Sequence, residues 1–138
     1  MSADGGGGDG GTAAADAAGK KVVLVSGCFD LLHSGHVQFF REAAELGELH
    51  VRVGSDANIM ALKNHLPMYN EQERLFMIRN LSCVHEAAVS VGTGRFDFFD
   101  DLKLLRPDIY FVNEDASQLQ PRLDFCKEVC WSVPILLL

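Results

Sequence analysis

Two histidines, His33 and His36, stand three positions apart in the stretch GCFDLLHSGH, which follows a short apolar run at residues 22–26. Each imidazole can donate a hydrogen bond to an anionic oxygen, with or without full protonation. Gly27 and Gly35 lack a Cβ, so the backbone there can approach a ligand closely. A helix that begins nearby adds free N–H groups and the positive end of its dipole. The pattern predicts a phosphate clamp, whose donors stabilise charge during an in-line displacement at phosphorus.

The same stretch has simpler interpretations, which the sequence leaves open. The two histidines can cap an ordinary turn between a strand and a helix, and a metal site on them lacks further ligands placed by the sequence. Asp30 can hold a metal ion, orient a histidine or cap the turn, and Phe29 can belong to the core. The chain has no G-x-x-x-x-G-K-[ST] motif, so the clamp is not a P-loop.

The elements that must position this stretch alternate between strand and helix. Strands are predicted at residues 22–26, 49–56, 87–91, 108–112 and from 133 onward, and helices at 37–47, 70–81, 96–105 and 121–130, with a loop at 60–69. This alternation indicates an α/β fold with a mainly parallel sheet. Ligands of such sheets bind beyond the carboxyl ends of the strands, at a topological switch point, so the loop after the first strand is the expected site.

Local signals refine this outline. Gly47 is expected to end the helix before it, because glycine is common just after a helix. His50 and Arg52 alternate with apolar residues, which predicts a strand with one less buried face. Asn70, with Glu73 three residues later, forms a capping-box-like start for the next helix.

Composition limits the classes of protein that fit. The chain has 138 residues, 48% of them hydrophobic, which is enough for one domain with a hydrophobic core. Its formal net charge of −7 and the lack of a basic stripe argue against a nucleic-acid partner. Residues 1–19 are mostly Gly, Ala and Asp, so we expect a disordered tail before a domain at 20–138.

Targeting and cysteine usage point to an intracellular protein. The tail lacks the basic start and the apolar run of a secretory signal, and no stretch reaches the length of a membrane span. Cys28, Cys83, Cys126 and Cys130 match neither a disulfide framework nor a paired C-x-x-C zinc pattern. We interpret them as reduced, and we expect a cytoplasmic location.

Several motifs recur in a familiar order: GCFDLLHSGH, LG at 46–47, SD at 55–56, LK and a proline at 62–67, ER at 73–74 and RPD at 106–108. Over roughly residues 20–115 the chain resembles the cytidylyltransferase-like family of nucleotidyltransferases. Glycerol-phosphate and ethanolamine-phosphate cytidylyltransferases belong there, as does the nucleotidyl-transferring part of ADP-heptose synthesis. The resemblance implies a Rossmann-like three-layer α/β domain.

The resemblance also implies roles for individual residues. His33 and His36 are expected to contact the phosphates of the nucleotide and to stabilise the transition state, with Lys63 and Arg74 as further catalytic residues. The nucleotide and the acceptor are expected to contact Gly27, Cys28, Phe29, Asp30, Gly35, Asp56 and Asp115.

The implied reaction is attack by a phosphomonoester on the α-phosphate of a nucleoside triphosphate, with release of pyrophosphate and with Mg²⁺ to offset charge. CTP is the favoured nucleotide, and an alcohol phosphate or a sugar phosphate is the acceptor. Adenylyl transfer from ATP to a sugar phosphate is an alternative, and a non-catalytic nucleotide-binding domain is another. Similar proteins suggest a homodimer.

Each assigned residue also has a structural alternative. Lys63 can be a solvated loop lysine, and Asp56 can be the N-cap of the helix ANIMAL. Arg74 can pair with Glu71 or Asn70 on its own helix.

The chain departs from the family pattern at several positions. Asn113 and Glu114 stand where glycine is common, Asn64 replaces a frequent glycine, and His65 stands where arginine is common. The chain ends on ILLL, without the Ser/Thr-rich phosphate-binding helix start that closes the family domain. We therefore expect a domain that is incomplete at its C-terminus, with weakened triphosphate binding.

Overall fold

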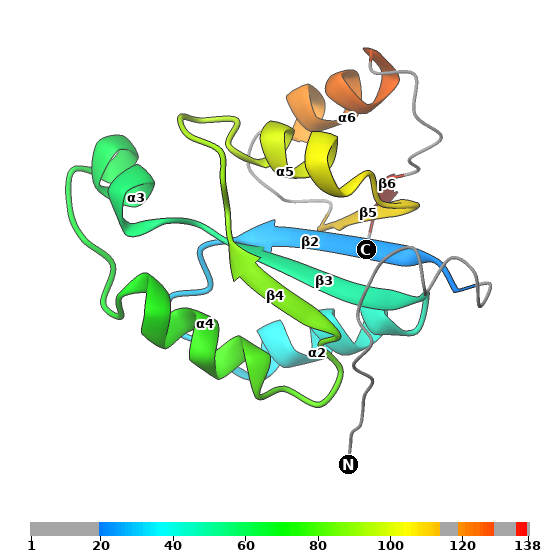
Figure 1. Ribbon diagram of the computed structural model, residues 1–138, viewed down its shortest axis with the longest axis horizontal. Helices are drawn as coiled ribbons and strands as arrows, with labels where there is room; N and C mark the ends of the chain where they lie inside the picture. The colour runs from blue at the N-terminus through cyan, green and yellow to red at the C-terminus, as the bar shows by residue number, and fades with distance from the viewer. Residues whose placement is uncertain (1–19, 114–118, 129–134, 138) are drawn as a thin grey trace.

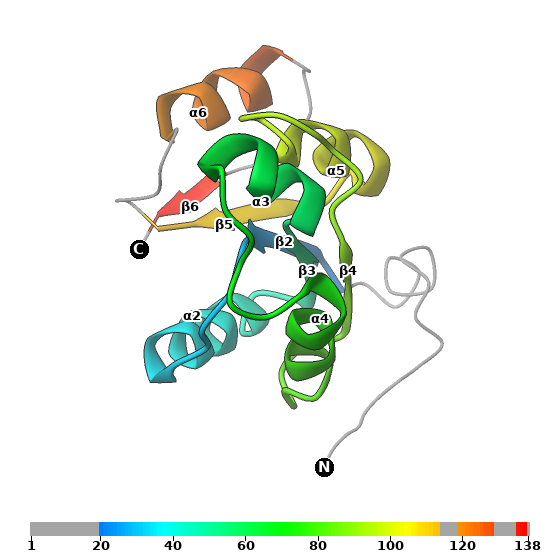
Figure 2. The ribbon, with the colours of Figure 1, turned by 90° about the vertical axis from the view of Figure 1, so that its left-hand side faces the viewer.

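The computed structural model describes residues 20–113, 119–128 and 135–137. In these ranges a five-stranded parallel sheet has the order β4-β3-β2-β5-β6. The strands are β2 (Val22–Gly27), β3 (Glu48–Val53), β4 (Glu86–Val89), β5 (Ile109–Val112) and β6 (Ile135–Leu137). The helices are α2 (Ser34–Ala44), α3 (Asp56–Lys63), α4 (Glu71–Arg79), α5 (Phe98–Leu105) and α6 (Leu119–Glu128). The predicted three-layer α/β fold is confirmed (Figures 1 and 2).

The two faces of the sheet are buried against different helices. Val23 and Val25 of β2 belong to a core cluster with Phe40 of α2 and Ile78 of α4. Leu24, which lies between the two valines, belongs instead to a cluster with residues of α5 and α6. Figure 1 shows α2 and α4 on one side of the sheet and α5 and α6 on the other. The apolar run in β2 is continuous because both of its faces are covered.

The helices after β3 differ partly from the prediction. Residues 60–63, predicted as a loop, are the last part of α3. Its N-cap is Ser55, whose side chain accepts the Asn58 N–H at 3.1 Å, so the alternative that Asp56 caps this helix is wrong. α4 has the predicted cap, because the Asn70 side chain accepts the Glu73 N–H at 2.9 Å.

The polar face of β3 is more buried than predicted, because His50 is only 2% exposed. Its register partner on β4 is Glu86, whose carboxylate lies 3.0 Å from His50 Nδ1. Arg52 Nη1 donates to the same carboxylate oxygen at 2.7 Å. Cross-strand partners thus let a polar strand face be buried.

Gly47 does not end a helix as predicted, because α2 already ends at Ala44. A Cβ at Gly47 would instead lie 2.3 Å from the carbonyl oxygen of Lys21. That oxygen accepts the Glu48 N–H at 2.8 Å, where β2 and β3 begin to pair. Gly47→Ala must therefore displace paired backbone, and we expect a loss of about 1–3 kcal/mol in the free energy of unfolding, measured by urea titration.

Gly54→Ala is the matched control for this prediction. A Cβ at Gly54 meets nothing closer than Cys28 Sγ, at 3.7 Å. This variant should change the free energy of unfolding by less than about 0.5 kcal/mol. Equal losses in the two variants would contradict the contact between Gly47 and Lys21 as the cause.

Some sequence predictions concern other parts of the chain. The tail at 1–19, Glu114, Asp115 and Cys130 lie outside the described residues. Among the helices that the structure describes, none is both long enough and apolar enough to cross a membrane.

Candidate functional site

The turn from β2 into α2 lies where the sheet changes its direction of growth. β3 pairs with one edge of β2 and β5 with the other, so the two halves of the sheet diverge from β2. Residues 28–33 connect the carboxyl end of β2 to the start of α2. In Figure 1 the arrowheads of β2, β3 and β4 point to this edge, and α3 lies beyond it. Ligands of open α/β sheets bind at such a switch point.

His33 and His36 form a reciprocal capping box on the first turn of α2. His33 Nδ1 accepts the N–H of Gly35 at 3.0 Å, and His36 Nδ1 accepts the N–H of His33 at 3.3 Å. The two rings lie 4.0 Å apart between centroids, at an angle of 31°. The structure therefore shows the capping role that the sequence left open.

This box determines where the histidine protons lie. A backbone N–H can only donate, so an Nδ1 that accepts one carries no proton. A neutral imidazole then holds its proton on Nε2, and both rings are Nε2–H tautomers. Partial burial, and next the neighbouring His33, lower the pKa of His36 below its usual 6.5. His33 is exposed and His36 half-buried, so the pair offers Nε2–H donors to a ligand at the start of α2.

Phe29 gives this turn a strained backbone. Its φ of 50° lies in the left-handed region, which bulky side chains rarely adopt. Its ring packs against Phe40 at 4.9 Å and against His36 at 5.7 Å between centroids. A Cβ at Gly27 would lie 2.9 Å from this ring, and one at Gly35 would lie 2.8 Å from the His33 ring. Both glycines thus make room for the chain's own rings.

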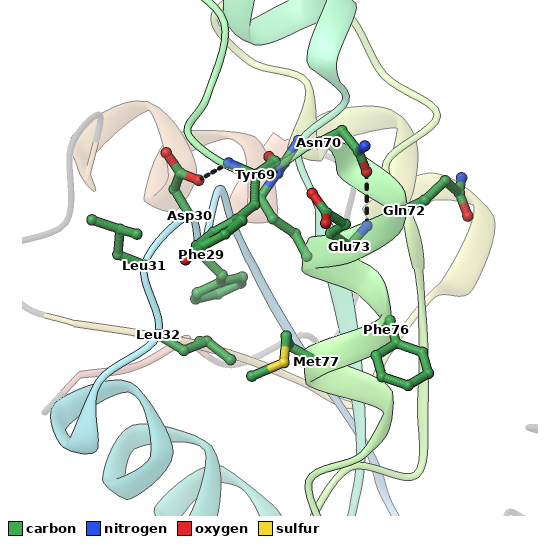
Figure 3. A pocket seen from close by; sticks show the side chains of 11 residues that line it. Phe29, Asp30, Leu31, Leu32, Tyr69, Asn70, Gln72, Glu73, Phe76 and Met77 are labelled. Atoms are coloured by element: carbon green, nitrogen blue, oxygen red, sulfur yellow. Dashed lines mark hydrogen bonds between the residues drawn. The ribbon is translucent and has the colours of Figure 1, made fainter.

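Asp30 anchors the loop between α3 and α4 over the turn. Its carboxylate accepts the N–H group of Met68 at 2.7 Å. It also accepts the N–H group of Tyr69 at 2.9 Å (Figure 3). Slight desolvation acts to raise the pKa of Asp30, but these two bonds and the charges of Arg74 and Lys63 outweigh it and lower the pKa. Asp30 therefore accepts backbone N–H groups as a cap does, but they belong to the loop before α4 and not to its own turn.

Arg74 of α4 joins three segments of the site and is only 1% exposed. Its Nε donates to the Tyr69 carbonyl at 2.9 Å and its Nη1 to the Cys28 carbonyl at 2.8 Å. Its Nη2 donates to Asp56 Oδ1 at 2.8 Å, in an ion pair at the start of α3. One planar guanidinium thus fixes the β2–α2 turn, α3 and the loop before α4 relative to one another.

Arg74 does not pair within its own helix, so that alternative is wrong. The Glu71 carboxylate accepts the N–H of Asp56 at 2.8 Å, and the Asn70 side chain accepts the N–H of Glu73. Asp56 in turn accepts the N–H of Glu71 at 3.1 Å. The starts of α3 and α4 therefore exchange carboxylates, each placed favourably at a helix N-terminus.

Lys63 is the last residue of α3 and is exposed, and its charge reaches Asp30. The structure therefore places it near the predicted site, on a helix instead of a loop. Among the described residues, the fold places five of the predicted site residues around the turn from Gly27 to Phe29: His33, His36, Asp30, Asp56 and Arg74.

A pocket of about 610 Å³ lies beside the turn, between residues 29–32 and α4 (Figure 3). Its apolar walls include Leu31, Leu32 and Met77, and its carboxylates are Asp30 and Glu73. The guanidinium of Arg74, which also lines it, is already bonded to the chain. The two carboxylates therefore make this pocket unfavourable for anionic phosphates.

The sequence interpretation did not identify Asn58, a buried polar residue of α3. Its side chain donates to the Gly94 carbonyl at 3.1 Å and accepts the Gly94 N–H at 2.6 Å. It also donates to Asp97 at 3.2 Å, and so it joins α3 to the loop that leads to α5. The signal was an asparagine within an otherwise apolar helical stretch.

Comparison with known proteins gives a match over most of the chain. The family model described as Cytidylyltransferase-like matches residues 24–130. A bifunctional protein HldE of Syntrophotalea carbinolica is 45% identical over 101 residues, covering 72% of this chain and 20% of the relative. An FAD synthase of Aciduliprofundum boonei is 40% identical over 96 residues, covering 69% of this chain and 62% of the relative.

Solved structures agree with the fold. A lipopolysaccharide core biosynthesis protein from Thermoplasma volcanium superposes with a TM-score of 0.74 at 26% identity, covering 86% of this chain and 96% of that one. A pantothenate synthetase from Thermus thermophilus has a TM-score of 0.63 at 13% identity, covering 86% and 55%, and supports the fold alone. The chain spans a fifth of the length of the HldE relative, 20%, and 62% of the FAD synthase.

Proposed function

Because the chain belongs to the cytidylyltransferase-like family of nucleotidyltransferases, we propose that it transfers a nucleotidyl group from a nucleoside triphosphate to a small phosphorylated acceptor. The observation that carries this proposal is the histidine box at the start of α2. It offers neutral Nε2–H donors at the switch point of the sheet, where a helix N-terminus also favours an anion.

In this reaction the donors stabilise negative charge on phosphate oxygens, and they transfer no proton. An oxygen of the acceptor phosphate attacks the α-phosphorus, and a new P–O bond forms. The bond from the α-phosphorus to its bridging oxygen breaks, and its electron pair leaves with pyrophosphate. His33 and His36 donate Nε2–H bonds to oxygens on which negative charge grows, and each such donor contributes about 10²–10³-fold to turnover.

We propose ATP as the nucleotide, although the resemblance alone favoured CTP. The relative named FAD synthase makes a product that contains an adenylyl group, and it is 40% identical to this chain. Donors that hold phosphates do not read the base, so His33 and His36 serve either nucleotide equally. The choice of nucleotide therefore rests on the relatives.

At this site Mg²⁺ would be held by the oxygens of the triphosphate and not by the protein. Asp30 and Asp56, the carboxylates joined to the turn, use both of their oxygens for N–H donors. Such carboxylates do not form the oxygen cage that holds Mg²⁺. Asp30 and Asp56 therefore do not fit a protein-held Mg²⁺ ion at this turn, and we assign no step to it.

Other roles implied by the family stay proposals. Lys63 is exposed and free to approach a phosphate from α3. Direct contact of Arg74 with a ligand requires that it release one of its three present acceptors. A homodimer has only the family resemblance in its support, and a cytoplasmic location has the cysteine usage and the tail composition.

Pyrophosphate release tests the proposal. The chain is incubated with ATP or CTP, Mg²⁺ and one acceptor at a time: flavin mononucleotide, ethanolamine phosphate, glycerol phosphate or a sugar phosphate. We expect turnover with one acceptor, at least about tenfold faster with ATP, which corresponds to about 1.4 kcal/mol in the barrier.

A faster reaction with CTP would replace the adenylyl proposal by cytidylyl transfer. Nucleotide binding without turnover, measured by calorimetry with each nucleotide, would favour the alternative of a non-catalytic nucleotide-binding domain. If the chain shows neither nucleotide binding nor turnover, the proposed function is rejected.

A further inference from the structure

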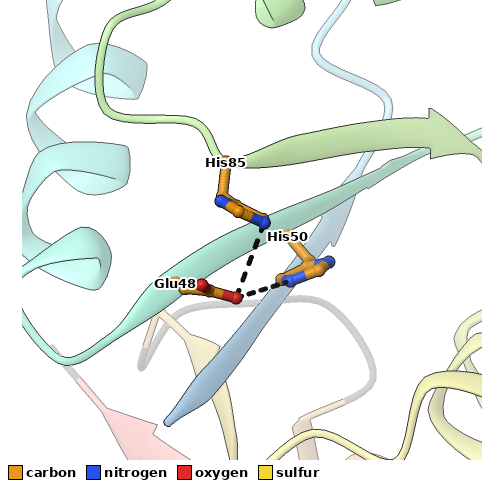
Figure 4. Close-up of side chains that lie close together, drawn as sticks. All are labelled: Glu48, His50 and His85. Carbon is orange, nitrogen blue, oxygen red and sulfur yellow. Dashed lines mark ion pairs between the residues drawn. The ribbon is translucent and has the colours of Figure 1, made fainter. Parts of the chain in front are cut away.

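A second group of side chains meets at the start of β3. Glu48 and His50 lie on the same face of β3, and His85 immediately precedes β4 (Figure 4). Glu48 Oε1 lies 3.8 Å from His50 Nε2 and 3.5 Å from His85 Nε2. The three atoms lie within 4.8 Å of one another. This group, the β3 cluster, is at the amino end of the strands, whereas the histidine box follows the carboxyl end of β2.

The atoms that face one another in the β3 cluster have no hydrogen-bond partner among the described residues. Glu48 Oε1, His50 Nε2 and His85 Nε2 are all buried and unsatisfied. The His50 side chain is only 2% exposed. A buried polar atom that lacks a partner is destabilising, so an arrangement with three of them in one place needs an explanation.

Hydrogen bonds between these residues do not provide the explanation. Both N···O distances exceed 3.4 Å, which is longer than an N–H···O bond. His50 already uses Nδ1 toward Glu86, at 3.0 Å. Arg52 Nη1 donates to the same Glu86 oxygen at 2.7 Å. An Nδ1–H of His50 can donate to this carboxylate oxygen, and the Nε2 lone pair of such a ring faces the cluster.

This arrangement is that of a metal-binding histidine. A ligating imidazole commonly donates its other N–H to a carboxylate, which fixes the ring and makes the ligand more basic. Two imidazole nitrogens and one carboxylate oxygen are a donor set that Zn²⁺ takes, with a fourth position for water, whereas Mg²⁺ and Ca²⁺ prefer oxygen alone.

The spacing also suits zinc. Ligand bonds of about 2.0–2.2 Å in a tetrahedron place the donor atoms roughly 3.3–3.6 Å apart. The two observed N···O separations, 3.5 Å and 3.8 Å, lie close to this range, and the two imidazole nitrogens lie within 4.8 Å of each other. The side chains of Glu48 and His85 are 12% and 16% exposed, which gives an ion a route to the cluster.

We propose that Glu48, His50 and His85 bind one Zn²⁺ ion, with Glu86 as the carboxylate that orients His50. The ion ties the start of β3 to the residue before β4, an edge strand of the sheet. It lies apart from the histidine box, so its role is to stabilise the fold. The proposal does not depend on the proposed nucleotidyl transfer.

The test uses the full chain after treatment with a chelator. Zinc is added, free metal is removed by gel filtration, and bound metal is measured by mass spectrometry. We expect about one zinc per chain, and a melting temperature at least about 5 °C higher with zinc than with Mg²⁺. His85→Gln and Glu48→Gln should both lose the retained zinc. Glu86→Gln should bind zinc about 10–100-fold more weakly.

Controls separate this site from other zinc ligands. His65→Gln removes an exposed histidine and should retain zinc, as should His33→Asn/His36→Gln and Cys126→Ser. Circular dichroism of each chelated variant shows whether it is folded, so that loss of zinc is not loss of structure. Cobalt in place of zinc should give visible bands without a thiolate charge-transfer band.

Three results would overturn the proposal. The first is that the folded wild-type chain retains no zinc. The second is that His85→Gln and Glu48→Gln retain zinc as well as the wild type does. The third is a thiolate band with cobalt, which would assign the metal to the cysteines.

Discussion

Replacing His33 by asparagine and His36 by glutamine in one chain is expected to lower turnover by about 10³-fold or more. Both imidazole Nε2–H donors are lost at once, and the amide N–H groups of asparagine and glutamine lie elsewhere when their oxygens accept the two capping N–H bonds. The measurement is the steady-state rate of pyrophosphate release with the preferred nucleotide and acceptor.

This double variant is chosen because it preserves the helix start. Asparagine is a favourable N-cap, and a glutamine three positions later completes a capping box as His36 does now. The free energy of unfolding should therefore stay within about 1 kcal/mol of the wild-type value. A histidine pair that served only as caps would leave turnover intact in this variant, which is the result that contradicts the clamp.

Two further variants complete the comparison. His33→Ala removes the cap as well as the donor, and it should lower stability by about 1 kcal/mol in addition to lowering turnover. Gln38→Ala changes an exposed residue one turn along α2, whose side chain donates to Glu42 at 2.8 Å. It should leave turnover unchanged and stability within about 0.5 kcal/mol.

The same box predicts an acid limit. The folded state lowers the pKa of His36, so the unfolded chain binds the proton more readily. The stability that neutral His36 contributes is fully present above pH 6.5, and it is lost as pH falls from 6.5 toward the lowered value. Turnover should fall in the same direction, because a proton on Nδ1 breaks the box. An increase in turnover on acidification would favour imidazolium donors instead.

Local chemistry explains which parts of the site the sequence could predict. His33 and His36 lie three residues apart, and so do Asn70 and Glu73, so each pair meets within one helical turn whatever the rest of the fold does. The alternation of apolar segments similarly indicated the parallel sheet, and through it the switch point after β2.

Contacts between distant segments explain what the sequence could not predict. Arg74 bonds to Cys28, 46 residues away, and to Asp56, 18 residues away, so its nearer neighbours on α4 were the wrong partners. His50 was predicted to lie on a less buried face because polar and apolar residues alternate there. The prediction was wrong because its cross-strand partner Glu86 can be identified only when the register of β3 and β4 is known. Polar residues thus misled the prediction wherever their partners came from another element.

Arg74→Met is expected to give the largest loss of stability among these variants, about 3 kcal/mol in the free energy of unfolding. Methionine fills much of the same space but leaves the Asp56 carboxylate and two carbonyl oxygens without their donor. The loss should be at the lower end of the range for buried ion pairs, because the Asp56 side chain is 27% exposed and keeps some water. Urea titration monitored by circular dichroism measures it.

Two controls distinguish this network from a general effect on α4. Arg79 lies on the same helix and is exposed, with a bond from Nε to the Ala87 carbonyl at 3.2 Å, and Arg79→Met should lose less than about 1 kcal/mol. Asp56→Asn combined with Arg74→Met should lose less than the sum of the single losses, by about 0.5–3 kcal/mol, because the two side chains interact directly. Additive losses would mean that the ion pair contributes little and that Arg74 acts through the carbonyls of Cys28 and Tyr69 alone.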